Sequence, residues 1–495
     1  MSTLDAALQG LGLVFAWPNI LYPVVGTLLA MTVSFLPGVS GVTLMALALP
    51  LTFAWEPLEV VLLFGALVGG ATFMGSVTAI LFNVPGSAPS AATMLDGHPL
   101  ARQGAARTAL ACAATASALG STIGVALLIL CLPVVRPLLL SFGPLEFLLL
   151  CLWGLTTIAM LGGSPVRAWA MAGLGLTLAF VGRDPRTADE RFTFGADYLV
   201  DGLAVVPVLL GLFAIAEIMR LVTSGRRTIA VDTGGGPLGG SVTAGIGAVL
   251  RHPGLLLRCS LLGSAIGIVP GIGGTVASFV AYGHAVQTAR PPVRFGDGDI
   301  RGVMAPEAAH DAKDGGSLLP TLAFGIPGSE GTVLLLAALT LHGLAPGRAM
   351  LENHLPLVFA LIWALFLSNW LTSLLGLAIT GPLARLMVIR TDLLAPVMLA
   401  LAVLGAIAYH GNGLDLALAA VFGIIGYYLA KHDWPRVPLV IAFVLGSVLE
   451  DNLLLTARLA GLGRIDPLDR PVAMVLVLLI VATIIWLWRG RVGAR

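Results

Sequence analysis

The chain has 495 residues, of which 57% are hydrophobic and only 11% are charged, and its mean hydropathy is +0.96. Soluble proteins carry about 25% charged residues, so this composition excludes a chain whose whole surface faces water. The net charge of +1 offers no basic field for nucleic acid. The composition therefore predicts an integral membrane protein that contacts the lipid bilayer.

Apolar segments near the bilayer-spanning length of about 20 residues follow one another along the chain. The first set is expected at 20–54, 58–83, 108–135, 145–161, 168–182 and 203–222. The second set is expected at 255–282, 315–343, 355–380, 393–409, 414–430, 437–457 and 472–488. These patterns predict an all-α polytopic membrane protein with a first repeat at 1–222, a Gly-rich linker at 223–252, a second repeat at 253–460, and a C-terminal loop with a final transmembrane helix at 461–495.

Each half of the chain carries two Pro-Gly breaks inside its apolar segments. The first half has Pro37-Gly38 and Pro85-Gly86, and the second half has Pro270-Gly271 and Pro327-Gly328. Backbone groups freed by such breaks cost several kcal/mol each in hydrocarbon unless they are buried in protein or line a wet cavity. Corresponding breaks in two halves of a membrane protein indicate the binding site of a transporter.

The distribution of Lys and Arg indicates how the two halves are oriented, because these residues gather in cytoplasmic loops. If every segment spans the bilayer, one side collects 12 of the 27 Lys and Arg residues, which is no bias. If segments 20–54 and 255–282 are re-entrant hairpins, one side collects 19 of the 27. The second arrangement predicts two inverted structural repeats with re-entrant hairpins and broken transmembrane helices. It places the N-terminus outside and the C-terminus in the cytoplasm.

Neutral polar side chains surround the breaks, and no Lys or Arg lies at them. Because a helix resumes after each break, the positive ends of helix dipoles face the break and suit a carboxylate. Carbonyls freed on the other side suit Na⁺. The side chains expected to contact substrate or coupling ion are Ser40, Thr43, Asn83, Ser87, Thr275, Ser278, Ser329 and Thr332. For Gly65, Gly69 and Gly75 a role in close helix packing is favoured instead.

Carboxylates near the breaks form a second group of candidates. Glu330 follows the last break and could bind a proton or Na⁺, or could cap its helix. Asp96 is expected to be a cap or turn residue, and it is expected to flank the breaks on the cytoplasmic side together with Glu307, Asp311 and Asp314. Glu307 and His310 have Glu-x-x-His spacing, but a di-metal bundle needs two such motifs, so no metal site is expected. No cofactor is expected beyond the coupling ion.

Several motifs in order resemble the large permease subunit (TctA family) of bacterial tripartite tricarboxylate transporters. They are the runs 75–86 and 96–104, Pro270 to Phe279, Ala305 to Ala309, and Gly325 to Ser329. The resemblance implies a bacterial inner-membrane permease that takes up organic carboxylates with an ion gradient by an elevator-type alternating-access motion. It also implies a small membrane subunit and a periplasmic solute-binding protein as partners, and a homodimer is compatible with it.

The chain departs from the family pattern at three places. His310-Asp311 replaces a frequent Asn-Asn, Phe73-Met74 replaces the usual Tyr-Gly, and Glu330-Gly331 replaces small or hydroxyl residues after the last break. A carboxylate at Glu330 disfavours a highly charged anion such as citrate unless that carboxylate is protonated or paired. Smaller or less charged carboxylates therefore stay open as substrates.

The leading hypothesis is a secondary active transporter and not an enzyme. Its substrate would be an organic dicarboxylate or tricarboxylate, moved with Na⁺ or H⁺. Two alternatives stay open: an intramembrane enzyme acting on a lipid-linked substrate, and a passive anion channel. The chain lacks a P-loop and a Ser/His/Asp set, which argues against ATP-driven transport within this chain and against hydrolytic chemistry.

Overall fold

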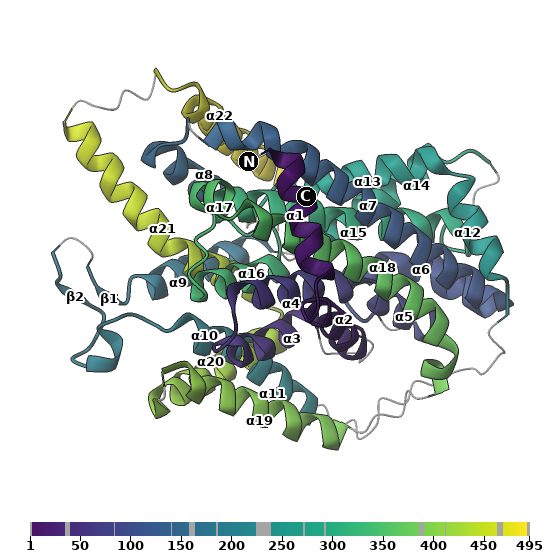
Figure 1. Ribbon diagram of the computed structural model, residues 1–495, viewed down its shortest axis with the longest axis horizontal. Coiled ribbons are helices and arrows are strands. Elements are labelled where there is room, and N and C mark those ends of the chain that lie inside the picture. The colour runs from purple at the N-terminus through teal and green to yellow at the C-terminus, as the bar shows by residue number, and fades with distance from the viewer. Residues whose placement is uncertain are drawn as a thin grey trace.

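The computed structural model describes residues 2–34, 40–83, 85–139, 141–157, 164–184, 187–223, 239–270, 273–291, 294–385, 391–410, 412–462 and 469–492. These residues are almost all helical (Figure 1), which confirms the predicted all-α class. Among them the one sheet pairs β1 (Gly182–Arg183) with β2 (Glu190–Arg191) in antiparallel register.

The helices of the first half differ widely in length, from the 5 residues of α10 to the 34 residues of α7. π-helical stretches at Ala101–Ala105 and Leu210–Ile215 join α6 to α7 and α10 to α11. In chain order the helices are α1 (Thr3–Phe15), α2 (Leu21–Ser34), α3 (Gly41–Ala48), α4 (Pro57–Gly70), α5 (Thr72–Phe82), α6 (Ser90–Leu100), α7 (Ala106–Leu139), α8 (Pro144–Thr157), α9 (Pro165–Ala179), α10 (Val205–Leu209) and α11 (Ala216–Thr223).

The helices of the second half also differ widely in length, from the 6 residues of α17 to the 31 residues of α18. They are α12 (Val242–Leu250), α13 (Pro253–Ile268), α14 (Gly273–Thr288), α15 (Ile300–Phe324), α16 (Glu330–Leu341), α17 (Arg348–Asn353), α18 (Leu355–Arg385), α19 (Thr391–His410), α20 (Gly413–Lys431), α21 (Arg436–Gly461) and α22 (Pro471–Val492). Half of the expected linker 223–252 lies outside the described residues, and α12 forms within its last part.

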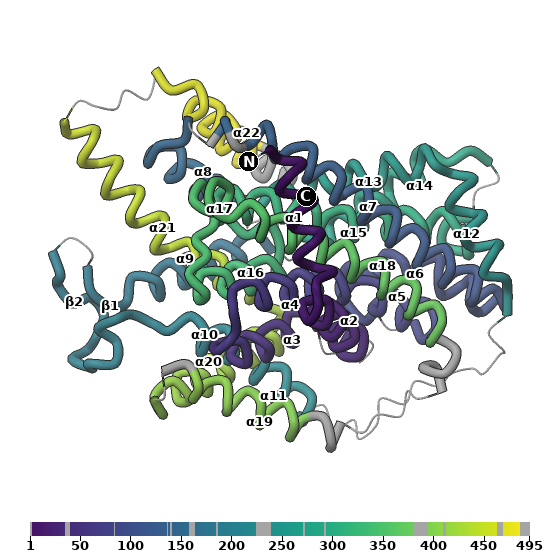
Figure 2. Tube along the Cα trace, viewed as in Figure 1, coloured from purple at the N-terminus to yellow at the C-terminus, as the bar shows by residue number. Residues whose placement is uncertain are grey.

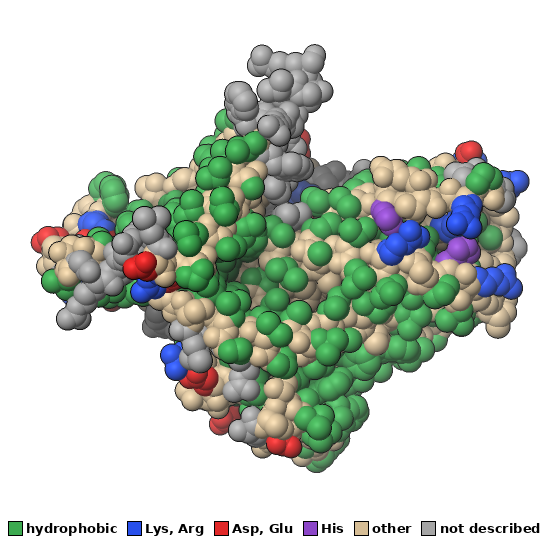
Figure 3. Space-filling view, turned by 90° about the horizontal axis from the view of Figure 1, so that it is seen from above, with side chains coloured by type: hydrophobic (Ala, Val, Ile, Leu, Met, Phe, Trp, Pro, Cys, Tyr) green, Lys and Arg blue, Asp and Glu red, His purple; other side chains and the backbone are tan. Residues whose placement is uncertain are grey.

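Six helical stretches among the described residues are long and apolar enough to cross a bilayer. They are Pro57–Phe82, Ser90–Val135, Val205–Thr223, Leu355–Ile379, Gly413–Lys431 and Arg436–Gly461. Hydrophobic side chains cover most of the face seen in Figure 3, and charged side chains gather near its edges. Both findings fit the membrane protein that the composition predicts.

The expected apolar segment 315–343 differs from the structure. Its first part belongs to α15, which begins fifteen residues earlier at Ile300, and its second part is the separate helix α16. Charged residues between Glu307 and Asp314 kept the first half of α15 out of the hydropathy pattern, although the fold buries them. The segments 20–54 and 255–282 each contain two short helices, whose junctions at 35–39 and 271–272 lie outside the described residues.

The two halves of the chain interlock. Helix α7 of the first half contacts α12, α13 and α15 of the second, while α18 of the second half contacts α1, α2 and α4 of the first. Figure 2 shows the same intermixing, with purple and blue segments lying among teal and green ones. The fold is therefore one body in which each half completes the packing of the other.

Glycines allow these helices to approach backbone to backbone. A Cβ on Gly120 or Gly124 of α7 would lie 2.4 Å from the carbonyl oxygen of Ala308 or Ala312 on α15. On α4, a Cβ on Gly65 would lie 2.8 Å from the Leu361 oxygen of α18. A Cβ on Gly69 would lie 2.7 Å from the oxygen of Leu365. The packing role expected for Gly65 and Gly69 is thereby confirmed.

Candidate substrate and ion site

The second break of the first half turns the chain sharply back onto α5. Helix α5 ends at Asn83, whose φ of 54° is left-handed. The N–H of Gly86 then donates to the carbonyl oxygen of Gly75 at 3.2 Å. A Cβ on Gly86 would lie only 2.6 Å from Gly75 Cα. Gly86 therefore has to be glycine for the break to lie against α5.

The second break of the second half repeats this geometry. Helix α15 ends at Gly325, which is also left-handed with φ of 68°. A Cβ on Gly328 would lie 2.7 Å from Ser317 Cα. In both breaks the left-handed residue stands two positions before the proline, and the glycine packs against the helix residue eleven positions earlier. The two breaks therefore share one local geometry.

Hydroxyl groups cap two of the helices that resume after the breaks. The N–H of Thr43 donates to Ser40 Oγ at 3.3 Å at the start of α3. At the start of α16, the N–H of Ser329 donates to Thr332 Oγ1 at 2.8 Å. Helix α6 has no side-chain cap, and Ser87 and Ser90 share a hydroxyl hydrogen bond of 2.8 Å at its start. These caps leave other N–H groups of the first turns available to an anion.

The remaining predicted residues lie at the first break of each half, Pro37-Gly38 and Pro270-Gly271. Pro37, Gly38 and Gly271 lie outside the described residues. Pro270 accepts a 2.5 Å hydrogen bond from Thr157 Oγ1 through its carbonyl oxygen. Thr275 is partly buried, and Ser278 is buried with its hydroxyl 3.5 Å from the Pro306 oxygen of α15. Ser278 therefore faces α15.

The described parts of the breaks meet in two pairs. Helix α6 contacts α14, and α3 contacts α16, so each pair joins one half of the chain to the other. A Cβ on Gly274 would lie 2.9 Å from His310 Cδ2 and 3.2 Å from Pro89 Cγ, which places His310 of α15 between the starts of α6 and α14. Helix α15 contacts α6, α14 and α16, and thereby links the two pairs.

One face of α15 carries carboxylates whose placement the sequence reasoning missed. Glu307, Asp311 and Asp314 have the i, i+4, i+7 spacing of a single helix face, and each is at most 1% exposed. They lie inside the fold and in the middle of a helix. Lys313 pairs with Asp314 at 2.5 Å. The spacing was the available signal, but hydropathy alone treats such residues as a loop.

Glu307 holds together the two helices that flank the second break. Its Oε1 accepts a 2.6 Å hydrogen bond from Ser76 Oγ of α5 and another from Thr93 Oγ1 of α6. Gly75 stands beside this contact, since a Cβ there would lie 2.9 Å from Ser90 Oγ. A carboxylate from the second half thus fixes the break of the first half.

Asp96 has a different role from the expected cap or turn. It lies within α6, and its Oδ1 accepts three N–H groups, from Gly296, Gly298 and Asp299, at 2.8 to 2.9 Å. Tyr282 donates to the other oxygen at 3.0 Å. Asp96 therefore fixes the loop that precedes α15, and the sequence could not show partners 200 residues away.

Glu330 is exposed at the first position of α16, although the rest of that helix is largely buried. The cations that act on its charge are Arg436 of α21 and Lys313 of α15. Arg436 also donates to the Leu212 oxygen at 2.7 Å. The site therefore includes two cations that are remote from the breaks in sequence, in addition to the neutral groups that sequence reasoning selected.

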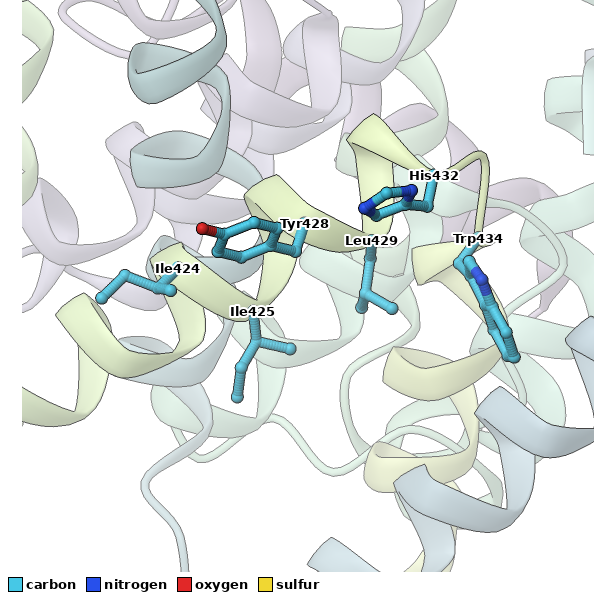
Figure 4. A pocket seen from close by; sticks show the side chains of 6 residues that line it. All are labelled: Ile424, Ile425, Tyr428, Leu429, His432 and Trp434. Atoms are coloured by element: carbon cyan, nitrogen blue, oxygen red, sulfur yellow. The ribbon is translucent and has the colours of Figure 1, made fainter.

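A separate groove of about 340 Å³ lies at the end of α20 (Figure 4). Its lining is apolar apart from one ring each of Tyr and His, and it contains none of the break residues; the lining residues are Ile424, Ile425, Tyr428, Leu429, His432 and Trp434. A carboxylate would lose its hydration there without gaining charged or N–H partners. The groove is therefore a poor candidate for the substrate site.

Two known proteins are similar to this chain in sequence. A protein of Agrobacterium vitis described as "Uncharacterized 52.8 kDa protein in TAR-I ttuC' 3'region" is 34% identical over 437 residues, 88% of this chain and 86% of the relative. A second, "Uncharacterized protein in TAR-II ttuC' 3'region" from the same organism, is 32% identical over 191 residues, 39% of this chain and 79% of the relative. No solved structure matches.

The family comparison covers most of the chain and both pairs of breaks. The profile of the tripartite tricarboxylate transporter TctA family matches residues 20–441, a range that includes every predicted site residue. The chain therefore belongs to the tripartite tricarboxylate transporter TctA family.

Proposed function

We propose that this chain is the permease subunit of a tripartite carboxylate uptake system and moves an organic dicarboxylate or tricarboxylate together with Na⁺ or H⁺ by alternating access. The observation that carries the proposal is the matched geometry of the breaks at Asn83–Ser87 and Gly325–Ser329. The family implies a small membrane subunit and a periplasmic solute-binding protein as the other components. The bacterial inner membrane is the location that such a system requires.

The substrate carboxylates would lie at the helix starts that follow the breaks. Free N–H groups in the first turns of α3, α6, α14 and α16 carry positive partial charge and suit a carboxylate. The hydroxyls and the amide around them supply further partners. The residues we propose for contact with substrate or coupling ion are Ser40, Thr43, Asn83, Ser87, Thr275, Ser278, Ser329 and Thr332.

We further propose that the two halves are inverted repeats with re-entrant hairpins. Helices α2, α13 and α14 have 14, 16 and 16 residues, fewer than the roughly 20 that span the hydrocarbon core. The equivalent contacts of α7 with α13 and α15, and of α18 with α2 and α4, support a pseudo-twofold relation. This arrangement would place the N-terminus outside and the C-terminus in the cytoplasm.

Transport into proteoliposomes tests the proposal. The chain is reconstituted with its small membrane subunit and solute-binding protein, and uptake of radiolabelled citrate, malate and succinate is followed under imposed Na⁺ or H⁺ gradients. We expect saturable uptake that depends on one gradient for at least one probe. Uptake that neither saturates nor depends on a gradient would indicate a channel, and a chemically altered probe would indicate an enzyme.

A further inference from the structure

Glu307 is a buried carboxylate without a cation. Its side chain is 1% exposed, and its Oε2 has no hydrogen-bond partner among the described residues. The charge that acts on it is that of Asp311, which has the same sign. An unpaired carboxylate is costly to bury, and it is relieved when it binds a proton or a cation. Asp311 differs, because the hydroxyls of Ser117 and Thr72 and the positive charge of Lys313 act on it.

The titratable groups on the helices packed against α15 do not supply that positive charge. Cys112 of α7 is another titratable group near Glu307, and the charge of Glu307 acts on its thiol. Asp96 of α6 and Tyr282 of α14 hydrogen-bond to each other. Helix α5 presents the hydroxyl of Ser76. None of these side chains is a cation, and Lys313 of α15 pairs with Asp314, so solution is the source from which Glu307 can take a neutralising charge.

A row of hydroxyl groups connects Glu307 to the second break. Ser76 Oγ lies 2.6 Å from Glu307 Oε1 and 3.3 Å from Ser90 Oγ. Ser90 Oγ lies 2.8 Å from Ser87 Oγ. Ser87 is one of the residues proposed to contact substrate. The row therefore runs without interruption from the buried carboxylate to the substrate site.

We propose that Glu307 is the carboxylate that binds the coupling proton, and that the hydroxyl row of Ser76, Ser90 and Ser87 transmits its protonation state to the substrate site. This inference rests on the proposed function and names its coupling ion and coupling residue. It differs from the sequence analysis, which left Glu330 open as a proton or Na⁺ site or as a helix cap.

The direction of the hydroxyl protons supplies the mechanism, since each hydroxyl has one proton to donate. When Glu307 is charged, Ser76 donates its one proton to Glu307 and has none left for Ser90, so that Ser87 donates to Ser90. Ser87 then presents only lone pairs to the site, which repel a substrate carboxylate. When Glu307 takes a proton from water, it donates to Ser76 and the row reverses, so that Ser87 donates to the substrate. The proton returns to water on the other side after the substrate leaves, and no covalent bond of the protein breaks.

The geometry favours a proton over Na⁺ at this position. Oxygen ligands around a metal cation all direct lone pairs at the ion and stand apart from one another. Here Ser76 and Thr93 direct their protons at one carboxylate oxygen, and the 2.6 Å separation is that of a hydrogen bond. His310 extends the titratable stripe, with its Nδ1 lacking a partner among the described residues, toward the starts of α6 and α14. Stripes of this kind are typical of intramembrane proton relays.

The transport experiment compares Glu307→Gln and Ser90→Ala with the wild type in the reconstituted complex, using radiolabelled citrate, malate and succinate. For Glu307→Gln we expect loss of accumulation driven by a pH gradient, while exchange of internal for external probe continues, because glutamine keeps the neutral form. Ser90→Ala should keep exchange and lose its dependence on pH. The matched control is Glu146→Gln, which removes another buried carboxylate, one that pairs with Arg470 at 2.9 Å. The control should behave as the wild type.

Infrared titration of the purified chain supplies a readout that needs no substrate. The carbonyl band of a protonated buried carboxyl group should titrate in the wild type and in Glu146→Gln, and should be lost in Glu307→Gln. An unchanged band in Glu307→Gln, or accumulation by that variant in a pH gradient, would overturn the inference. So would wild-type accumulation driven only by Na⁺ at constant pH. If no probe exchanges in the wild type, the proposed function fails, and the infrared comparison still decides the protonation of Glu307.

Discussion

Gly328→Ala tests whether the position of the last break controls transport. The φ of Gly328 is not left-handed, so alanine meets no backbone strain there and the substitution probes space alone. The added methyl carbon would lie 2.7 Å from Ser317 Cα on α15 and 2.9 Å from the Gly267 oxygen on α13. Both neighbours are backbone atoms of packed helices and cannot rotate away. The break itself therefore has to move.

The size of the movement follows from contact distances. Two carbon atoms pack at roughly 3.5–4.0 Å, so the segment has to shift by about 1 Å. Overpacking of this kind costs about 1–3 kcal/mol. The shift displaces Ser329, which follows Gly328 directly and is the N-cap residue of α16. The same free energy, applied to the binding-competent position of Ser329, lowers substrate affinity by about 5- to 150-fold.

Gly331→Ala is the matched control, three residues further along. A Cβ at Gly331 would lie 3.7 Å from Met45 Sδ and 3.9 Å from Val68 Cγ2, which is ordinary contact. Alanine in a helix is favoured over glycine by about 1 kcal/mol, so this variant should be as stable as the wild type or more stable. Gly86→Ala should repeat the effect of Gly328→Ala in the first half, because its Cβ would lie 2.6 Å from Gly75 Cα.

Thermal unfolding in detergent and uptake in proteoliposomes measure the two consequences. We expect a lowered unfolding midpoint and strongly reduced uptake for Gly328→Ala and Gly86→Ala, and neither change for Gly331→Ala. Wild-type uptake by Gly328→Ala, with an unchanged midpoint, would refute the reasoning that the break is fixed by its contact with α15 and α13.

Five further substitutions, at four positions, test single contacts. Asn83→Ala and Ser329→Ala should abolish uptake and leave membrane insertion intact. Asn83→Gly is the control for backbone strain, because glycine removes the amide but suits the left-handed φ of 54° at this position. Full uptake by all of these would contradict the site. Asp96→Asn should lower stability by about 1–3 kcal/mol in thermal unfolding. A neutral amide oxygen accepts the three N–H groups more weakly than a carboxylate oxygen, and the Tyr282 hydroxyl loses its acceptor to an NH₂ group. Arg470→Ala should lower the free energy of unfolding by about 1–3 kcal/mol, because it leaves the buried carboxylate of Glu146 with the Gly143 N–H as its partner among the described residues. An unchanged unfolding midpoint would show that the ion pair does not stabilise the fold.

The sequence predicted those features whose signals are local. Apolar runs located most of the long helices, and the Pro-Gly pairs located the ends of α5 and α15 near Asn83 and Gly325. These signals are reliable because the cost of unpaired backbone in hydrocarbon restricts where helices can break. The packing role of Gly65 and Gly69 was predictable for the same reason, since membrane helices meet through small residues.

The buried carboxylate face of α15 could not be predicted from such signals. Hydropathy assigns Glu307 and Asp311 to water, whereas the fold surrounds them with helices from both halves. The hydroxyls that bond to Glu307 come from Ser76 and Thr93, more than 200 residues away in the chain. Only the tertiary arrangement brings them together. The same holds for Arg436, whose charge acts on Glu330 from another helix.

Glu330 and Glu307 have different surroundings, and these suit the two carboxylates to different roles in transport. Glu330 is exposed beside the last break, where the charges of Arg436 and Lys313 act on it. Glu307 is buried and has only a like charge for company, so it is the one that needs a proton. Two carboxylates in one site whose environments differ in this way take opposite roles. Lys313 pairs with Asp314 and Arg436 also acts on Glu217, so these two cations offset the charge of Glu330 only in part. Citrate and the smaller carboxylates therefore have to be compared directly in the same uptake assay.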